Sequence, residues 1–436
     1  MRRRHAWLVI ILLFGVTFPA RGEAGGLSNT ETFGGFEFNF NNPGARALGM
    51  GGAFIGLADD ATAAVTNPAG LVILQRPELS AEVKFTRFRN QINDFSNNTF
   101  EAPTATVHGR AFDDSVTTPS FFSLVFPSER LVAAVYVREL VNFESQFQTE
   151  GPFIPVPGFQ LFRLFPVQSR IEVTGLDIGA GVGINLSKQH PLLPDIGASI
   201  EFSYGVIHSK LQRFDFTSFE PADFSPTNVR STNLVDGSDI GVGFNIGALW
   251  RPLKELSVGA VYRRGPRYNM RETLENGPTL GPGTRNFTDF SLKVPDVYGV
   301  GAAIRPIDRL TISADVVRIR YSQMLQGLNL LVTVNPPRVA DYKLDDATEF
   351  HVGAEYIMFL GTIPIAARAG FYTNPDHRIR YTGPDVGQRL FFPGGRDQYH
   401  GTAGLGFVPF PGVQFDAAAN VSREIREFSL STVFRF

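Results

Sequence analysis

Apolar and polar residues alternate with a period of two along much of the chain, most clearly in its last ten residues. Phe428, Leu430 and Phe434 fall on one face of this segment, and Ser429 and Ser431 fall on the other. Successive side chains of a β-strand point to opposite faces, so this alternation predicts strands that each carry one apolar face. The same pattern runs through residues 310–316, 349–356 and 413–421.

The alternation predicts roughly fourteen strands, an even number. We place them at residues 79–90, 119–127, 130–142, 168–186, 194–212, 233–250, 254–264, 288–304, 309–322, 346–359, 362–372, 397–409, 412–422 and 426–436. Short turns alternate strictly with much longer connections, except for one tight hairpin before the final strand. The long connections are 91–118, 143–167, 213–232, 265–287, 323–345 and 373–396.

The sorting of these connections decides between two kinds of all-β protein. A soluble sandwich also alternates, but it has no reason to collect short turns on one rim and long loops on the other. A bacterial outer-membrane barrel does so, with long loops outside the cell and both termini in the periplasm. In hydrocarbon every backbone amide must be paired, and a closed barrel lets strands do this without an edge. The fold class is therefore predicted as all-β, a transmembrane antiparallel β-barrel of about 14 strands.

The N-terminus has the features of an export signal. Residues 1–5 are basic, and the apolar stretch 6–18 is too short for a membrane-spanning helix, which needs about 20 residues. We expect a signal peptide at residues 1–24, cleaved near Ala24. A permanent anchor would need a longer apolar run.

Composition narrows the class of protein further. The chain has 44 Gly and 40 Phe, which suits a fold that displays many aromatic side chains at a boundary. Its net charge of −2 offers no basic surface, so nucleic acid is not an expected partner. The absence of cysteine excludes disulfides, thiol catalysis and a lipid-modified cysteine.

No catalytic or metal-binding pattern is visible. The seven histidines show no paired helical spacing for zinc, and the chain lacks both a Gly-x-Ser-x-Gly elbow and a Gly-Lys-Ser/Thr phosphate loop. His400, near Asp397 and Tyr399, forms the one mildly suggestive cluster, and a position at the barrel rim explains it better. We therefore expect no enzyme, no cofactor and no metal.

Residues 42–71 form a segment that does not alternate and is dominated by small side chains. Such a segment can pack backbone against backbone, and residues 58–65 suit a short helix that Asn67 and Pro68 would end. We expect it to lie inside the barrel lumen as a plug, called the hatch below. The predicted domains are then a hatch at 25–78 and a barrel at 79–436. A periplasmic tail is the alternative, although a tail has no reason to exclude bulky side chains.

This motif resembles the N-terminal hatch of the FadL-type family, the outer-membrane transporters of long-chain fatty acids and aromatic hydrocarbons (OmpP1/FadL/TodX). The family's Asn-Pro-Ala falls at Asn67, Pro68 and Ala69, after the glycines Gly49, Gly51 and Gly52. Residues 292–297 and 301–306 extend the resemblance, and the chain ends in Phe436 after alternating aromatics, as barrel-assembly signals do.

The resemblance implies a function and a set of partners. It implies a porin-like channel in the outer membrane of a Gram-negative bacterium that admits hydrophobic small molecules passively, most simply long-chain fatty acids. Ligand would be captured outside, held in an apolar pocket and released when the hatch shifts, sideways through a gap at a kinked third strand. Outer-membrane lipid and the barrel-assembly machinery, through Phe436, are the other expected partners of a monomer. Relatives that act as shuttle proteins of a secretion system keep a protein-interaction role open as the alternative.

Two groups of residues are candidates for ligand binding. The loop at 143–167 is rich in apolar side chains, and an exposed apolar patch usually marks a binding surface; these side chains are Phe153, Ile154, Phe159, Phe162 and Phe165. Alternatively, they pack into a cap over the barrel. A carboxylate headgroup would need a cation in the lumen, for which Arg368 and His351 point inward by parity. An interior network with Glu349, Glu355 or Asp416 is the plainer role for these two.

The strands offer a docking surface for the hatch. Ten glycines share the inward face by parity near one end of the barrel: Gly179, Gly181, Gly183, Gly241, Gly243, Gly247, Gly299, Gly301, Gly404 and Gly406. A wall without side chains permits close backbone approach, so we expect the hatch to dock there. Bending of the strands is the alternative reason for these glycines. The third strand carries no glycine or proline that would mark a kink, and residues 131–137 are apolar on both faces.

Overall fold

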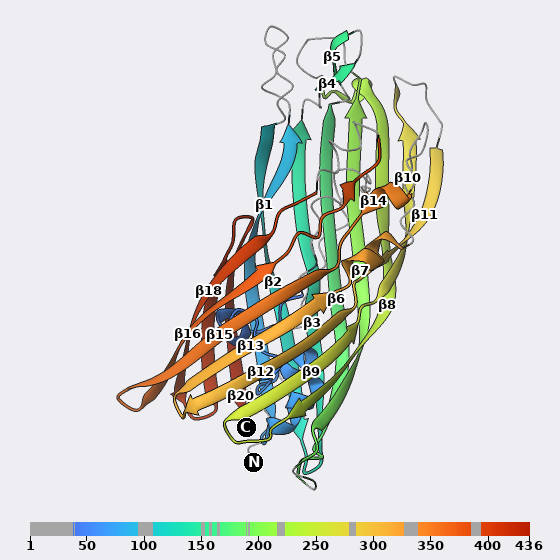
Figure 1. The fold of residues 1–436 in the computed structure, drawn as a ribbon. Helices are drawn as coiled ribbons and strands as arrows, with labels where there is room; N and C mark the ends of the chain where they lie inside the picture. Colours follow the sequence, from blue (N-terminus) through green and yellow to red (C-terminus); the bar gives the residue numbers. More distant parts are fainter. Residues whose placement is uncertain are drawn as a thin grey trace, which may run out of the picture.

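A computed structural model describes residues 38, 40–94, 108–149, 153–156, 159–163, 166–188, 190, 192–215, 223–278, 285–326, 339–384 and 394–436. Most of these residues belong to one 16-stranded antiparallel sheet, and pairing between β8 and β9 closes it (Figure 1). The predicted signal peptide and the first part of the predicted hatch lie outside the described residues.

The wall is made of fourteen strands, because two of them are each divided into two pieces, β9 with β10 and β11 with β12. The first half of the wall contains β1 (Glu78–Asp94), β2 (His108–Pro127), β3 (Leu131–Thr149), β6 (Val167–Ile184), β7 (Asp195–Phe214), β8 (Val229–Trp250), β9 (Leu256–Arg264) and β10 (Arg267–Asn276). The second half contains β11 (Arg285–Lys293), β12 (Val297–Ile307), β13 (Leu310–Ile319), β15 (Ala347–Leu360), β16 (Ile363–Asn374), β18 (Gln398–Phe410), β19 (Val413–Val421) and β20 (Ile425–Arg435). The predicted barrel of fourteen antiparallel strands is confirmed.

Short elements complete the description. Two small hairpins pair β4 (Phe153–Val156) with β5 (Phe159–Arg163) and β14 (Tyr342–Lys343) with β17 (Arg380–Tyr381). Single 3₁₀ turns are η2 (Pro226–Asn228), η4 (Tyr321–Leu325) and η5 (Val339–Asp341). None of the described helices is long and apolar enough to cross a membrane.

Several wall strands of the first half are longer than the sequence predicts. β2 begins at His108 instead of 119, β3 continues to Thr149, and β10 occupies part of the predicted loop 265–287. Their added ends still alternate, with Tyr268 and Met270 buried, but their outward residues are polar. Because these ends lack an apolar outward face, the alternation of apolar and polar residues does not identify them as strands, and the sequence analysis assigns them to loops. These strands project beyond the others at the end with the long connections, which we call the long-loop end (Figure 1).

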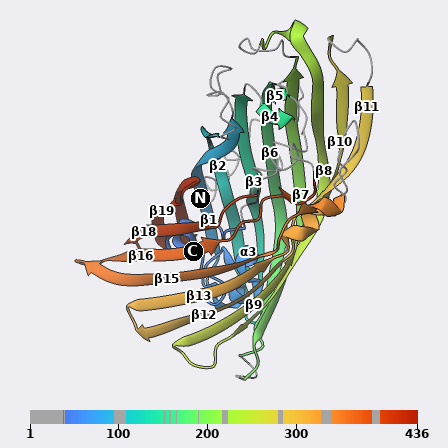
Figure 2. The same ribbon diagram turned by 45° about the horizontal axis from the view of Figure 1, so that its top comes forward.

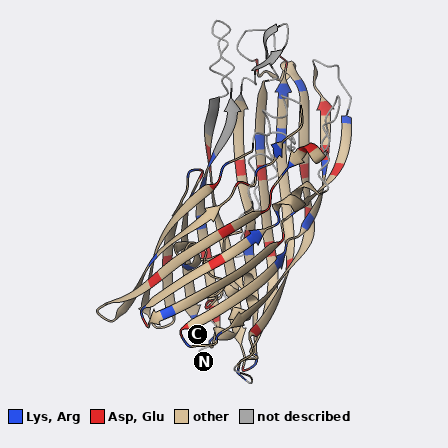
Figure 3. Ribbon diagram, in the orientation of Figure 1, with Lys and Arg blue, Asp and Glu red and all other residues tan. Residues whose placement is uncertain are grey.

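The two faces of the wall differ in polarity as the alternation predicts. Ile178 and Phe202 point outward and are 57% and 56% exposed, whereas the neighbouring Asp177 and Ser203 are fully buried in the lumen. Charged residues occur along the strands as well as at the turns (Figure 3). The wall therefore presents an apolar outer skin and, at the level of Asp177 and Ser203, a polar inner face.

The hatch lies inside the barrel near the end with the short turns (Figures 1 and 2). It contains α2 (Ala45–Gly49), α3 (Ala63–Thr66) and the 3₁₀ helix η1 (Pro68–Ile73). The predicted helix at 58–65 is too long, because the chain turns at Ala58, whose φ is 32°, and only residues 63–66 are helical. The helix does end at Asn67, whose backbone is extended.

Candidate functional site

The backbone of the hatch lies directly against glycines of the wall. A Cβ added at Gly353 would lie 2.1 Å from the carbonyl oxygen of Met50, and one at Gly370 would lie 2.2 Å from the amide nitrogen of Gly51. No side chain fits at either position without moving the hatch. Gly51 itself has a φ of 66°, a conformation that side chains other than glycine rarely adopt.

The predicted glycine belt is confirmed in part. Six of its members face the hatch within 4 Å of an added Cβ: Gly181, Gly183, Gly247, Gly299, Gly301 and Gly404. Four face other partners, such as Tyr136 against Gly179 and Pro266 against Gly241, so for them the prediction is wrong. The structure adds glycines that parity reasoning missed, namely Gly197, Gly259, Gly353 and Gly370.

Polar side chains of the wall hydrogen-bond to the hatch backbone. The Asp315 carboxylate accepts from the amides of Phe54 and Ile55 at 2.7 and 2.8 Å. Asn245 donates to the carbonyl of Val65 at 2.6 Å, and Ser257 donates to that of Gly56 at 2.6 Å. The hatch satisfies part of its backbone with its own turns and short helices, and the wall supplies partners for these other buried peptide groups.

Asn67, Pro68 and Ala69 lie at the centre of this contact. The Asn67 amide donates to the carbonyls of Ile55 and Ala248 at 3.0 and 3.1 Å, and its oxygen accepts from the amide of Ala69. Asn67 thus joins two parts of the hatch to β8. Pro68 begins η1, where its missing N–H costs nothing, and it packs against Gly197.

A network of ion pairs links the hatch to the wall beside this contact. Arg46 of α2 binds Glu355 through two nitrogens at 3.0 Å and Asp59 at 2.6 Å. Glu355 also accepts from Arg368 at 2.7 Å, and Arg368 binds Asp416 at 2.7 Å. The structure therefore places the candidate Arg368 in an interior network next to the hatch.

Burial and charge act in opposite directions on the ionisable groups of the hatch. Burial alone would lower the pKa of Arg46, but the charges of Asp59 and Glu355 hold it well above its usual value. Burial raises the pKa of Asp60 above its usual value, even though Arg46 lies nearby. Arg46 therefore stays charged and keeps the hatch attached to Glu355.

The candidate His351 contacts the hatch as well. Its Nδ1 lies 2.7 Å from the carbonyl oxygen of Gly51, and its Nε2 lies 3.1 Å from Glu349. Tyr372 stacks on His351, and His400 stacks on the other side of Tyr372 at 4.1 Å. His400 is thus buried in the lumen, not at the rim as the sequence suggested.

Asp315 offers a direct test of the hatch contact. Replacing Asp315 with alanine leaves two buried amides of the hatch without acceptors, at a cost of about 1–3 kcal/mol each. We expect amide hydrogens of residues 45–74 to exchange with deuterium at least about tenfold faster in the detergent-solubilised variant. Asp289→Ala, an exposed carboxylate on β11, is the matched control. Equal exchange in all three proteins would show that Asp315 does not hold the hatch.

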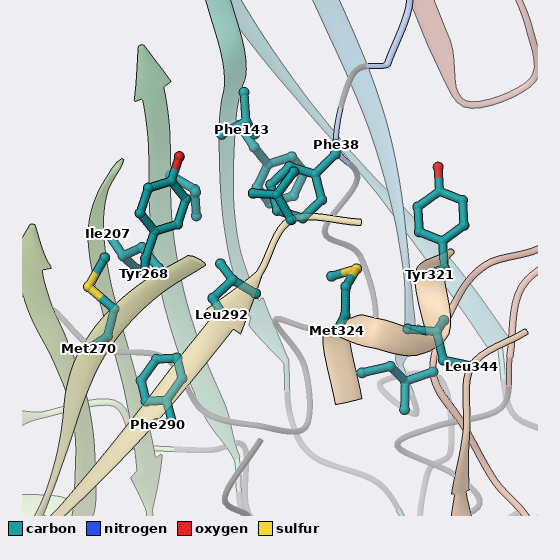
Figure 4. Close-up of a cluster of buried hydrophobic side chains, with 14 of the residues drawn as sticks. Phe38, Phe143, Ile207, Tyr268, Met270, Phe290, Leu292, Tyr321, Met324 and Leu344 are labelled. Carbon is teal, nitrogen blue, oxygen red and sulfur yellow. The ribbon is translucent and has the colours of Figure 1, made fainter. Parts of the chain in front are cut away.

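Beyond the hatch, toward the long-loop end, the lumen is lined by a continuous group of buried hydrophobic side chains, which we call the apolar cluster. Figure 4 shows aromatic, aliphatic and methionine side chains from β3, β7, β10, β11 and η4 gathered there. Its members are Phe38, Leu140, Val141, Phe143, Ile171, Val173, Ile207, Val235, Tyr268, Met270, Phe290, Leu292, Val294, Val297, Ile319, Tyr321, Met324, Tyr342, Leu344, Ala347, Ile379 and Tyr381. Sequence reasoning missed these residues because it looked for apolar faces that point outward.

A cavity of 60 Å³ adjoins the cluster where it meets the hatch. Phe38, Val141 and Tyr321 of the cluster line one side of it. Lys84 lines the other side and forms an ion pair with Glu139 at 3.3 Å. The apolar cluster therefore ends at a partly buried lysine, beside the carboxylates of Glu139, Glu349 and Glu427 in the lining of the same cavity. Parity places Lys84 in the lumen, but the sequence analysis did not single it out.

Backbone pairing between β2 and β3 is incomplete along the apolar cluster. Within residues 108–127 and 131–149, pairs extend only from Pro127↔Val132 to Phe121↔Arg138. Leu140 forms a β-bulge in β3, and the register of β2 shifts at the same level, beside Pro119. Side chains cross the unpaired part, since Thr118 donates to Glu139.

A second interruption lies where two wall strands break side by side. Gly265 and Pro266 separate β9 from β10, and residues 294–296 separate β11 from β12. Lys293 holds the two breaks together through the carbonyl of Gly265 at 2.5 Å and Asp296 at 2.7 Å. Tyr268 follows the first break, and its ring packs against Gly205 of β7, two strands away along the wall.

The proposed capture loop is only partly visible. Phe153 and Ile154 lie on β4, and Phe159 and Phe162 lie on β5, a small hairpin at the long-loop end. The side chains of these four residues, and all of Phe165, lie outside the described residues. Ligand capture by them remains a prediction. No group of three or more possible metal ligands occurs within the described ranges.

Residues 173–421 match the model of a family described as outer membrane protein transport protein (OMPP1/FadL/TodX). No curated protein matches the chain.

Among solved structures, a Pseudomonas aeruginosa FadL homologue has 15% identity and a TM-score of 0.61, covering 92% of this chain and 99% of that one. The toluene transporter TodX of P. putida has 14% identity and a TM-score of 0.58, covering 91% and 99%. The toluene transporter TbuX of Ralstonia pickettii has 14% identity and a TM-score of 0.56, with the same coverage. At these identities the likeness is one of fold.

Proposed function

Because the chain belongs to the OMPP1/FadL/TodX family and is thus an outer-membrane channel for hydrophobic compounds, we propose that it takes up long-chain fatty acids passively. The single observation that carries the proposal is the apolar cluster ending at Lys84. An alkyl chain gains about 0.8 kcal/mol for each methylene that it buries. A carboxylate at the end of that chain needs a cation, and among the described residues Lys84 is the one lysine or arginine that lines the cavity. Because Glu139, Glu349 and Glu427 line the same cavity, the headgroup must take the place of Glu139 as the partner of Lys84.

The proposed route begins at the β4–β5 hairpin outside the cell and continues into the apolar cluster. The adjoining cavity of 60 Å³ holds only a few water molecules, so a fatty acid must part the side chains around it. Met270 and Met324 suit that task, because an unbranched thioether adapts its shape easily. The unpaired part of β2 and β3 is the proposed exit into the membrane, since parting the wall there breaks no backbone ladder.

The alternative role, a docking protein of a secretion system, does not require an apolar lumen. The apolar cluster buries large side chains that such a protein would have no use for, which favours the transporter. Monomeric behaviour and recognition of Phe436 by the barrel-assembly machinery belong to the proposal. The exposed position of Phe436 at the end of the last strand supports the second of these.

The substrate can be tested with two ligands that share a chain and differ in headgroup. We expect oleate to bind the purified protein more tightly than oleyl alcohol, by on the order of tenfold, because only the carboxylate pairs with Lys84. The double variant Lys84→Met, Glu139→Gln removes both charges and should abolish that difference. The variant Arg271→Met, Asp289→Asn removes an exposed ion pair elsewhere and serves as the control. If the wild type binds oleyl alcohol as tightly as oleate, the fatty-acid proposal is wrong and a neutral hydrophobic substrate replaces it.

A further inference from the structure

The outer surface of the barrel carries a short row of aromatic and basic side chains across three neighbouring strands. On β9, β12 and β13, Tyr262 pairs with Tyr298, and Tyr298 pairs with Arg318. The two tyrosine rings lie 4.8 Å apart, and their strand neighbours Val261 and Val297 point into the lumen. The three side chains therefore form one continuous strip on the outside.

A second arginine stands at the other end of the strip. Arg264, the last residue of β9, is exposed, and its guanidinium lies over the ring of Phe244 at 6.0 Å. Phe244 in turn packs edge-on against Tyr262 at 5.8 Å. Exposed Arg267 follows at the start of β10 and donates to Ser291. Two guanidinium groups thus flank a platform of three aromatic rings.

The strip marks the edge of the apolar outer skin. Val300 and Val316 come directly below it on β12 and β13 and are 56% and 40% exposed. Tyr298 and Arg318 lie near the long-loop ends of their strands, so the strip faces the outer leaflet of the membrane. A lipid can therefore rest its acyl chains on the valines while its headgroup reaches the arginines.

Charge selects the kind of headgroup. In the described part of the chain, Arg264 and Arg267 form no ion pair. Arg318 is 49% exposed and lies 3.7 Å from its nearest carboxylate, Asp346. Tyr262 donates to the Asp296 carboxylate at 3.2 Å, and Lys293 pairs with that same carboxylate at 2.7 Å. The strip therefore still carries excess positive charge at the level where lipid headgroups lie, and guanidinium forks match the geometry of phosphate.

We propose that this strip binds a phosphorylated lipid of the outer leaflet, with Arg264 and Arg318 on its phosphate groups. Tyr262 and Tyr298 pack against the headgroup, and the acyl chains lie on Val300 and Val316. The site is separate from the lumen and does not depend on which compound the barrel transports. It requires only the outer-membrane location that the family establishes.

The test measures binding of diphosphoryl lipid A to the full-length protein in detergent by native mass spectrometry. The double variant Arg264→Gln, Arg318→Gln should bind it about thirtyfold more weakly, because it removes two arginines from the level of the headgroup. The variant Arg271→Gln, Arg285→Gln removes the same charge from β10 and β11 and should bind like the wild type. Dephosphorylated lipid A should bind the wild type as weakly as diphosphoryl lipid A binds the double variant.

Three results would overturn the proposal. Unchanged binding by the double variant would show that Arg264 and Arg318 do not bind the lipid. Equally weakened lipid binding in the control variant would show that the effect comes from the net charge of the protein and not from these two arginines. Displacement of lipid A by inorganic phosphate at equal concentration would show a site for free phosphate and not for a lipid. Because the dephosphorylated lipid is compared on the wild type, the test does not depend on the folding of a variant.

Discussion

Replacing Gly353 and Gly370 together with valine is expected to open the barrel to small hydrophilic solutes. Each added Cβ would lie within 2.2 Å of the Met50–Gly51 backbone, so the hatch must move away from the wall. Overpacking of this kind costs about 1–3 kcal/mol for each substitution. When it is inserted into planar lipid bilayers, the variant should show steady conductance steps. The wild type should show few, because its hatch fills the lumen.

Gly401→Val is the matched control, because it adds the same side chain to the same region of the wall on the outer face. An added Cβ at Gly401 meets nothing within 4 Å. This variant should fold and conduct like the wild type. If the double variant conducts no more than Gly401→Val, the hatch does not close the lumen, and its docking against the glycines has no bearing on permeability.

The periodicity of the sequence predicts most of the wall, for a physical reason. Within the membrane, one face of each wall strand contacts lipid and must be apolar, and this requirement produces the period-two pattern of the sequence. Above the membrane the demand disappears. β10 therefore keeps the inward residues Tyr268 and Met270 but has no apolar outer face, and the sequence pattern predicts a loop there.

The inside of the barrel is less predictable, because it depends on contacts between distant residues. Asp315 reads as an ordinary inward polar residue, and only the fold shows that its carboxylate binds two amides about 260 positions away in the sequence. The sequence analysis finds Arg368 and His351 together with their wall partners Glu355, Asp416 and Glu349. It does not find the contact of His351 with the Gly51 carbonyl of the hatch. One signal was overlooked, namely the adjacent pair Leu140 and Val141, where two apolar residues in succession interrupt the alternation.

Removing the β-bulge at Leu140 is expected to block the uptake of fatty acids. Deleting Leu140 leaves Val141 next to Glu139, so every later residue of β3 keeps its face while the bulge disappears. Combined with Pro119→Val, which restores a backbone donor to β2, the deletion should let pairing continue beyond Phe121↔Arg138. Two new ladder bonds, at about 1 kcal/mol each, would lower the population with an open wall about thirtyfold.

Uptake of radiolabelled oleate by whole cells that express equal amounts of folded barrel measures this effect. Leu140→Ala is the control, since it keeps the bulge and removes only the side chain. Normal uptake by the deletion variant would mean that ligand leaves another way, and the 470 Å³ cavity beside the hatch at the short-turn end is the competing exit. Arg46, Glu355 and Arg368 line that cavity, so an alkyl chain leaving through it would pass a set of ion pairs and lose its apolar surroundings. The unpaired part of β2 and β3 meets the apolar outer skin at its lower end, where exposed Leu176 pairs with Glu139. An exit at this point would keep each methylene out of water, and we therefore propose it as the route of lower free energy.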